Sequence, residues 1–186
     1  MTDVRGTVRL WLVPAVAVLL VVVLLGLSGG LRSGRGSQGR TAAAAEQLDL
    51  ARWQLVVHSV ELVPGEDYDP TLPPSLRVAL RATFLGERST YGFERGLVGV
   101  QGTGGGPLGT EEEPSVTSVR SDGFDPDVPQ ELELDFTWPK APATPPAVVR
   151  VLVHDERLKD NYLFDADWVL QPTPVAHLDL PLTDQR

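Results

Sequence analysis

The segment that decides the fold is Gln130–Trp138, which reads QELELDFTW. Apolar residues occupy every second position, namely Leu132, Leu134, Phe136 and Trp138, and the positions between them are acidic or polar. Successive side chains of a β-strand point to opposite faces, so this alternation predicts a strand with one buried and one hydrated face. Strands of this kind are typical of antiparallel sheets that cover a core on one side.

The same alternation occurs upstream in Ser75–Leu85, where apolar residues such as Leu76 and Val78 alternate with Arg77 and Arg81. Weaker strand patterns follow in six further segments, which clusters of Pro, Gly and Asp separate. We expect these strands over residues 53–63, 93–100, 116–120, 148–154, 162–170 and 175–182. Seven or eight short strands with no helical period between them predict an all-β fold, an antiparallel β-sandwich.

The predicted sandwich resembles the immunoglobulin-like domains of membrane-anchored, uncharacterised actinobacterial surface proteins. The resemblance lies in Trp53–Val57 (WQLVV) at the start of the domain, in a strand of the Leu76–Phe84 type, and in a late aromatic strand that ends in proline, Phe136–Pro139. It covers about residues 50–182 and implies an immunoglobulin-like fold and an extracytoplasmic location, without catalytic residues. The chain has no cysteine, so it lacks the disulfide of antibody domains.

A second informative segment is Leu10–Leu27, LWLVPAVAVLLVVVLLGL, which contains no charged residue. At about 1.5 Å per helical residue it would span roughly 27 Å, close to the thickness of the bilayer hydrocarbon. It could be an uncleaved anchor, a cleaved signal peptide or a buried core helix. We expect a transmembrane anchor, because the run is longer than a signal-peptide core and no polar face interrupts it.

The orientation of this anchor depends on the charges around it. Arg5 and Arg9 precede the segment, and three arginines follow it, so the positive-inside count is nearly balanced. The short leading tail and the large following domain favour a cytoplasmic amino terminus and an extracytoplasmic carboxyl-terminal domain. The lipid bilayer is therefore the first expected partner.

The composition changes along the chain and marks the expected domain boundaries. After the anchor, the sequence is rich in Gly, Ser and Arg, which is typical of a flexible linker, and Ala42–Leu50 favours a turn or two of helix. The expected parts are a cytoplasmic tail (1–9), a transmembrane helix (10–27), a linker (28–49), the β-sandwich (50–182) and a carboxyl-terminal tail (183–186).

Charge is divided unevenly between the two ends of the chain. Residues 1–40 contain five Arg and one Asp, whereas the remainder contains 11 basic and 24 acidic residues, a net charge of −13. An acidic domain repels nucleic acid, so we exclude DNA and RNA as partners. The absence of cysteine excludes thiol catalysis and cysteine-ligated zinc.

Two acidic loops are the expected docking surface for a basic partner protein. The first contains Glu111, Glu112 and Glu113, and the second contains Asp122, Asp125 and Asp127. The three aspartates are also weak candidates for a calcium site, since calcium prefers several oxygen ligands on a turning loop. Their spacing matches no EF-hand, and Asp is common in turns, so we predict no metal.

No motif in the chain indicates catalysis or a cofactor. His154 ends a predicted strand next to Asp155 and Glu156, but the spacing matches no metal-ligand pattern. The glycine-rich residues 102–109 lack the closing Gly-Lys-Ser/Thr of a phosphate loop, and there is no Gly-x-Ser-x-Gly motif. We therefore predict that the protein is not an enzyme. We expect Trp53, Trp138 and Trp168, which lie in predicted strands, to pack in or over the core.

These observations predict a single-pass membrane protein that presents a β-sandwich outside the cell and binds another, unidentified envelope protein. Two alternatives remain open. The acidic loops and His154 could form a metal-dependent binder or hydrolase, or the chain could be an accessory subunit of a transporter or secretion complex.

Overall fold

The computed structural model describes residues 39–65, 72–110, 114–116, 123–159 and 167–186. Within these ranges the chain is all-β, with one short 3₁₀ helix and no α-helix. The elements are β1 (Arg40–Thr41), β2 (Gln47–Asp49), β3 (Trp53–Val63), β4 (Ser75–Phe84), η1 (Arg95–Leu97), β5 (Val98–Gly102), β6 (Ser115–Val116), β7 (Pro129–Thr137), β8 (Val148–Val153), β9 (Glu156–Lys159), β10 (Asp167–Leu170) and β11 (Ala176–Asp184).

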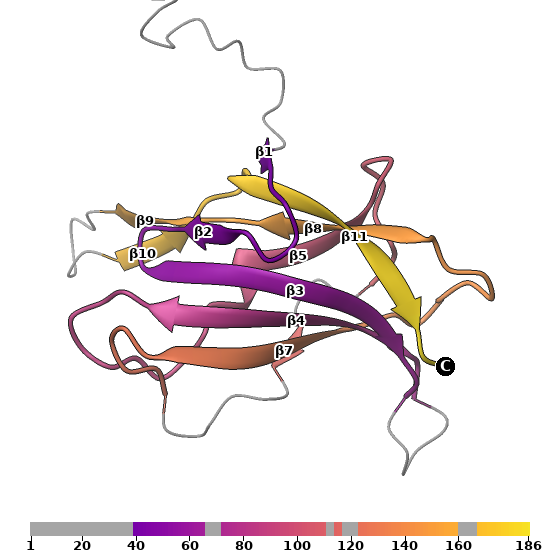
Figure 1. The fold of residues 1–186 in the computed structure, drawn as a ribbon, viewed down its shortest axis with the longest axis horizontal. Coiled ribbons are helices and arrows are strands. Elements are labelled where there is room, and N and C mark those ends of the chain that lie inside the picture. The colour runs from indigo at the N-terminus through magenta and orange to yellow at the C-terminus, as the bar shows by residue number, and fades with distance from the viewer. Residues whose placement is uncertain (1–38, 66–71, 111–113, 117–122, 160–166) are drawn as a thin grey trace, which may run out of the picture. The chain divides into compact units, whose positions relative to one another are not determined.

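The strands form one curled sheet and one separate hairpin (Figure 1). The order in the sheet is β5-β8-β11-β3-β4-β7-β6, with β1 added to β11 and β2 added to β3. The hairpin consists of β9 and β10, which pair only with each other. The sheet is mixed, since β11 runs parallel to both β1 and β3. The expectation of a purely antiparallel sheet is therefore wrong.

The strand β11 joins the two halves of the sheet. Its first part, Ala176–Pro181, pairs antiparallel with β8, and its last part, Leu182–Asp184, pairs parallel with β3. The switch occurs just after Pro181, a residue that cannot donate a ladder hydrogen bond. Figure 1 shows β11 crossing obliquely from β8 towards the end of β3. The strand β11 therefore links the two halves of the sheet through its backbone hydrogen bonds to β8 and to β3.

A single hydrophobic core lies between these halves. The predicted alternation is confirmed in β7, where Leu132, Leu134 and Phe136 are buried, and in β4, where Leu76 and Leu80 are buried. The other half contributes side chains of β8 and β11, and all of them belong to one cluster. The buried faces of the amphipathic strands therefore account for the assembly of the sheet.

The strand β3 contains a bulge that keeps its apolar residues on the core side. Trp53, Leu55 and Val57 are buried at odd positions, but Val60 and Leu62 are buried at even positions. The pairing with β4 shifts between Val57 and Ser59, so that His58 is the extra residue. One inserted residue reverses the side-chain alternation, and both apolar sets can face the same core.

The amino-terminal part of the sheet differs from the sequence-based expectation. Ala42–Leu50, expected to contain helix, instead carries β2, whose Leu48 is buried. A turn with Ala45 at φ 58° precedes β2, and Gln47–Asp49 pairs with Gln54–Val56. Tertiary pairing overrides the helix propensity of the alanines here. The sheet also begins before residue 50 and continues to Asp184, beyond both expected ends of the sandwich.

The strand count differs from the sequence-based expectation, and the immunoglobulin-like topology stays a prediction. The consecutive strands β3 and β4 are neighbours in one sheet, over the register Trp53–Val63 against Ser75–Phe84. The described residues contain eleven strands, not seven or eight, because several short strands have no clear periodicity in the sequence.

The predicted tail and anchor, residues 1–27, and the first part of the linker lie outside the described residues. Among the residues that the structure describes, no helix has the length and hydrophobicity needed to cross a bilayer. The transmembrane anchor therefore stays a prediction from the sequence.

We predict that Leu178→Ala destabilises the domain by about 2–5 kcal/mol, because Leu178 is fully buried on β11 where the two halves of the sheet meet. Urea denaturation measures the free energy of unfolding. The control is Val175→Ala, at an exposed position just before the same strand, which should change it by less than about 0.5 kcal/mol. Equal effects of the two changes would contradict the role assigned to β11.

Candidate interaction surface

The structure describes the second acidic loop from residue 123 onward. Within this part, Asp125 and Asp127 form hydrogen bonds with other residues of the domain. Asp125 accepts a hydrogen bond from the Ser89 hydroxyl at 2.6 Å, and its carbonyl accepts one from the Val128 N–H. Asp127 has a positive φ of 58°, and its N–H donates to the Phe84 carbonyl at 2.8 Å. Both aspartates therefore shape the turn that leads into β7.

The other residues of the predicted docking and calcium sites, Glu111, Glu112, Glu113 and Asp122, lie outside the described residues. Their role in docking stays a prediction. In the part of the chain that is described, no three His, Asp or Glu side chains come together in a way that could hold a metal ion.

Each histidine has a separate neighbourhood. His154 Nδ1 lies 3.0 Å from the Gln171 carbonyl, and His177 Nε2 lies 3.0 Å from the Thr41 hydroxyl, which fastens β1 to β11. His58 lies on the outer face of β3, with Nε2 3.7 Å from Glu131. Asp155, which follows His154 in the sequence, accepts a hydrogen bond from the Ala51 N–H at 2.8 Å and so holds the β2–β3 turn. The cluster around His154 has a structural role in these contacts.

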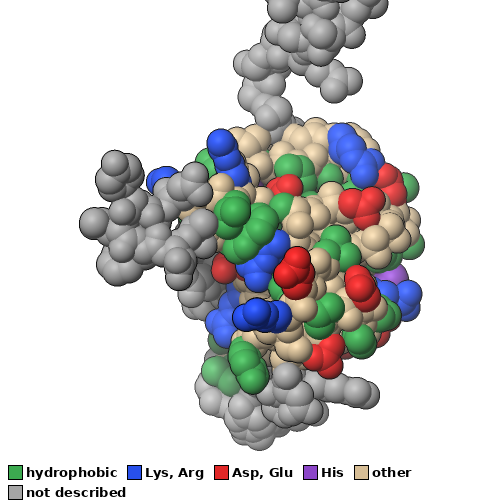
Figure 2. All heavy atoms as spheres, turned by 90° about the vertical axis from the view of Figure 1, so that its left-hand side faces the viewer, with side chains coloured by type: hydrophobic (Ala, Val, Ile, Leu, Met, Phe, Trp, Pro, Cys, Tyr) green, Lys and Arg blue, Asp and Glu red, His purple; other side chains and the backbone are tan. Residues whose placement is uncertain are grey.

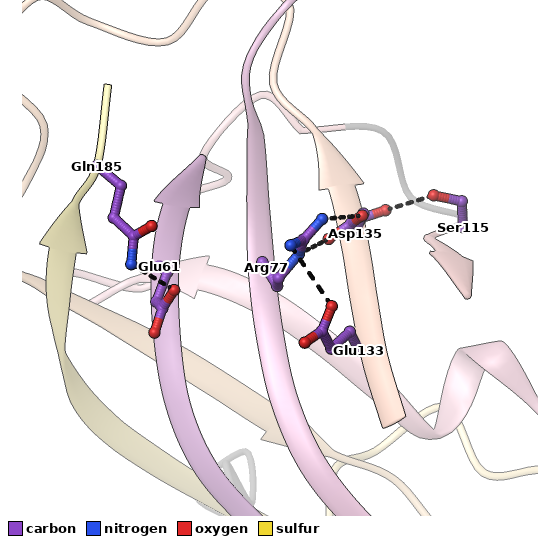
Figure 3. Close-up of polar contacts among 6 residues, drawn as sticks. All are labelled: Glu61, Arg77, Ser115, Glu133, Asp135 and Gln185. Carbon is purple, nitrogen blue, oxygen red and sulfur yellow. Dashed lines mark hydrogen bonds and ion pairs between the residues drawn. The ribbon is translucent and has the colours of Figure 1, made fainter. Parts of the chain in front are cut away.

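The hydrated face of the predicted strands is a network of paired charges (Figure 3). Arg77 on β4 forms a two-pronged ion pair with Asp135 on β7, with distances of 2.8 and 3.0 Å, and lies 3.4 Å from Glu133. Ser115 on β6 donates to the Asp135 carbonyl, and Gln185 donates to Glu61 on β3 at 2.7 Å. The acidic residues of β7 are thus used in cross-strand pairs.

An aromatic cluster fills the opposite end of the core from the β3–β4 connection. The Trp53 ring contacts the rings of Phe84, Phe93 and Phe124, with centroids 4.9, 5.2 and 5.0 Å away. Trp53 and Trp138 are buried, as predicted. Trp168 does not lie in the core, since 38% of its surface is exposed, and it stacks on Arg52 instead.

Arg52 connects this aromatic cluster to the β9–β10 hairpin. Its guanidinium carbon lies 5.1 Å from the centre of the Phe84 ring and 5.2 Å from that of Trp168. It also lies 3.5 Å from the carboxylate of Glu156, the first residue of β9. Stacking on two rings and pairing with one carboxylate suit the planar guanidinium group, and they hold the hairpin against the domain.

Glu156 is buried in an unfavourable setting. Its side chain is 4% exposed, and Oε2 has no hydrogen-bond partner among the described residues. Burial raises the pKa of this carboxyl, Arg52 partly opposes the shift, and Glu94 adds to it. The Trp53 Nε1–H lies close enough to lower the pKa a little, but forms no hydrogen bond of normal geometry. The site therefore contains a carboxyl whose ionisation opposes folding.

The outer end of the hairpin exposes apolar side chains. Leu158 and Trp168 are direct cross-strand partners, 48% and 38% exposed, and Val169 is 43% exposed. Val169 follows Trp168 in the same strand, so its side chain points to the opposite face. We call Leu158 and Trp168 the hairpin surface. Arg157 and Lys159 lie on the same hairpin. Figure 2 looks at this end of the domain, where hydrophobic side chains lie next to Lys and Arg side chains.

A pocket of about 600 Å³ adjoins the base of the hairpin. It lies between β5 and β7, near the two ends of the curled sheet. Its lining includes Val100, Leu108, Phe136, Leu152 and His154. The described lining residues include no Asp, Glu, Lys or Arg, in contrast to the acidic surface of the domain.

Sequence reasoning missed this pocket, although a signal was present. Gly99 and Gly102 lie within a segment that otherwise has the composition of a strand. Glycine in a strand is typical of positions where another backbone or a ligand comes close. No signal marked Glu156 or Arg52, because their proximity depends on how the hairpin folds back.

Comparison with known proteins adds no assignment: no family model, no curated protein and no solved structure matches this chain.

We predict that Glu156→Gln changes how stability depends on pH. A raised pKa in the folded state means that Glu156 stabilises the fold below its unfolded-state pKa, and that this contribution is lost as pH rises through the folded-state pKa. The variant lacks this loss, so wild type should lose stability relative to it as the pH rises above the ordinary glutamate pKa and through the raised folded-state pKa. Urea denaturation at several pH values measures the difference.

The control for that experiment is Asp179→Asn, which should behave in the opposite way. Hydrogen bonds from Arg150 lower the pKa of Asp179, so its contribution is present at neutral pH and is lost as pH falls through the folded-state pKa. Parallel stability profiles of wild type and Glu156→Gln would contradict the strained setting of Glu156.

Proposed function

We propose that the chain is a single-pass membrane protein whose extracytoplasmic β-sandwich binds another protein of the cell envelope. In this proposal Leu10–Leu27 is the transmembrane helix, residues 1–9 are cytoplasmic, and the described domain lies outside. The fold would be immunoglobulin-like in having two layers on one core. The curled sheet and its single hydrophobic core support a two-layer arrangement.

The observation that carries the binding role is the hairpin surface. Leu158 and Trp168 are partly exposed on one face of a hairpin that pairs with no other strand of the described domain. Exposed aromatic and aliphatic side chains beside cations are typical of protein interfaces, where Trp and Arg contribute strongly. Arg52 holds Trp168 in one position, which reduces the entropy lost on binding.

The anchor would assist binding by restricting the partner search. If residues 28–39, which precede β1, form the flexible linker that their composition predicts, these 12 residues would have a root-mean-square span of roughly 20 Å, and the domain would stay near the bilayer. Partners in or on the same membrane then meet it at a high effective concentration. Weak contacts at the hairpin surface would suffice for a stable complex.

We predict the topology as follows. A fusion of alkaline phosphatase after Arg186 should be active in bacterial cells, and a fusion of a cytoplasm-only fluorescent protein at the same point should be dark, because each folds on one side of the membrane only. Deletion of residues 10–27 should reverse both results. Fluorescence together with silent phosphatase in the full chain would show that the proposed orientation is wrong.

We predict that the hairpin surface touches the partner in cells. A photo-crosslinking amino acid at position 168 should give a discrete adduct on a denaturing gel, because Trp168 would lie inside the interface. The matched control is position 72, where Leu72 is 41% exposed at the other end of the β3–β4 pair. Adducts of equal yield from both positions, or none from position 168, would argue against the proposed surface.

A further inference from the structure

The strand β5 has one free side within the described part of the chain. It is the last strand in the sheet order and pairs only with β8. The His154 N–H donates to the Leu97 carbonyl at 2.8 Å, which sets the phase of the ladder. Residues Gly99 and Gln101 therefore direct their backbone groups to β8, and Val98 and Val100 direct theirs away from it.

The outward-directed groups are satisfied at both ends of β5 but not in its middle. The Val98 N–H donates to the Arg95 carbonyl, and the Gly102 N–H donates to the Gly106 carbonyl at 2.9 Å. No described residue bonds the Val98 carbonyl or either backbone group of Val100. Three strand-type hydrogen-bonding groups are thus available in a row.

Val100, which carries two of these three groups, borders the pocket described above. Gly99 and Val100 both line it, and Phe136 and Leu108 provide apolar walls. A row of backbone donors and acceptors next to an apolar recess is the pattern that binds an extended peptide: hydrogen bonds recognise its backbone, and the recess takes one of its side chains. The volume of about 600 Å³ is in the range of ligand pockets.

From this arrangement we infer that the chain binds an extended, apolar peptide segment of its partner as an added strand on β5. The described lining residues carry no Asp, Glu, Lys or Arg, which selects uncharged side chains in the recess. The chain after residue 40 carries a net charge of −13, so basic residues next to the apolar segment complement the charge of the domain. The inference rests on the proposed protein-binding role and specifies the chemistry of the partner.

The test uses the full-length chain in detergent micelles and a synthetic peptide, Lys-Val-Thr-Val-Thr-Val-Lys. Its control is the same peptide with methylated backbone nitrogens at alternate residues, which cannot complete a strand ladder. Peptide affinity is measured by fluorescence anisotropy, and exchange of the Val100 N–H is measured by NMR. We expect the unmodified peptide to bind and to slow this exchange. The affinity of the methylated peptide should be lower by a factor of about ten or more.

Two variants probe the site from different sides. Gly99→Leu fills the pocket, and its Cβ would be in ordinary contact with Leu152 at 3.8 Å. Val100→Pro removes an outward N–H that β8 does not use. Each should weaken binding by about tenfold, because one loses the recess and the other a backbone bond. The matched control Gly104→Leu places the same side chain in open space and should bind as wild type does.

Four results would overturn the inference. The peptide could fail to bind at millimolar concentration, or it could bind Gly99→Leu as tightly as wild type. The Val100 N–H could be protected from exchange before peptide is added. The chain could also associate with itself in a manner that Val100→Pro abolishes, which would make a second copy the occupant of β5. Adducts at position 168 combined with absent peptide binding would reject this inference alone and leave the proposed function standing.

Discussion

The structure depends on the way β11 changes partners along its length. Antiparallel pairing with β8 and parallel pairing with β3 make one strand a member of both halves of the sheet. Leu178 and Leu180, at the crossing, are buried in the core that the halves share. Without this strand, the β5–β8 pair would have no hydrogen-bonded link to β3, β4 and β7, and the apolar face of each half would be open to water.

The end of the domain near the hairpin balances opposing interactions. Trp53 packs against three aromatic rings, which favours burial, but the same site encloses the carboxyl of Glu156. Arg52 contacts both parts of this site: its guanidinium group stacks on Phe84 and Trp168 and forms an ion pair with Glu156. An interaction of this kind fixes the position of the hairpin more than it adds to stability, since a buried charge pair loses much of its attraction to desolvation. In this position the hairpin leaves Leu158 and Trp168 partly exposed.

The strands that were predicted well are those with a clear side-chain alternation. Residues 53–63 were expected as a strand and form β3, and Ser75–Leu85 and Gln130–Trp138 correspond to β4 and β7 within one residue at each end. Their alternation reflects local backbone geometry, which the sequence encodes directly. The errors, such as helix in Ala42–Leu50, concern short segments whose state depends on contacts with distant residues. For these segments local propensity is a weak guide.

The candidate sites divide in the same manner. Sequence reasoning could identify acidic turns, but Asp125 and Asp127 have local structural partners that account for them. The pocket on β5 and the Arg52–Glu156 pair join segments about 35 and 100 residues apart, which no local pattern reveals. Only the glycines of β5 gave a trace of its exposed edge in the sequence.

The sequence by itself determined the all-β class, the positions of the long strands, the acidic charge of the domain and the hydrophobicity of Leu10–Leu27. Each of these follows from composition or from the two-residue period of a strand. The tertiary structure alone decided the strand order, the crossing of β11, the exposure of Trp168 and the side of β5 that no described strand pairs with. These properties depend on which strands pair over long sequence separations. Pairing is chosen by the fit of whole apolar faces and not by any single segment.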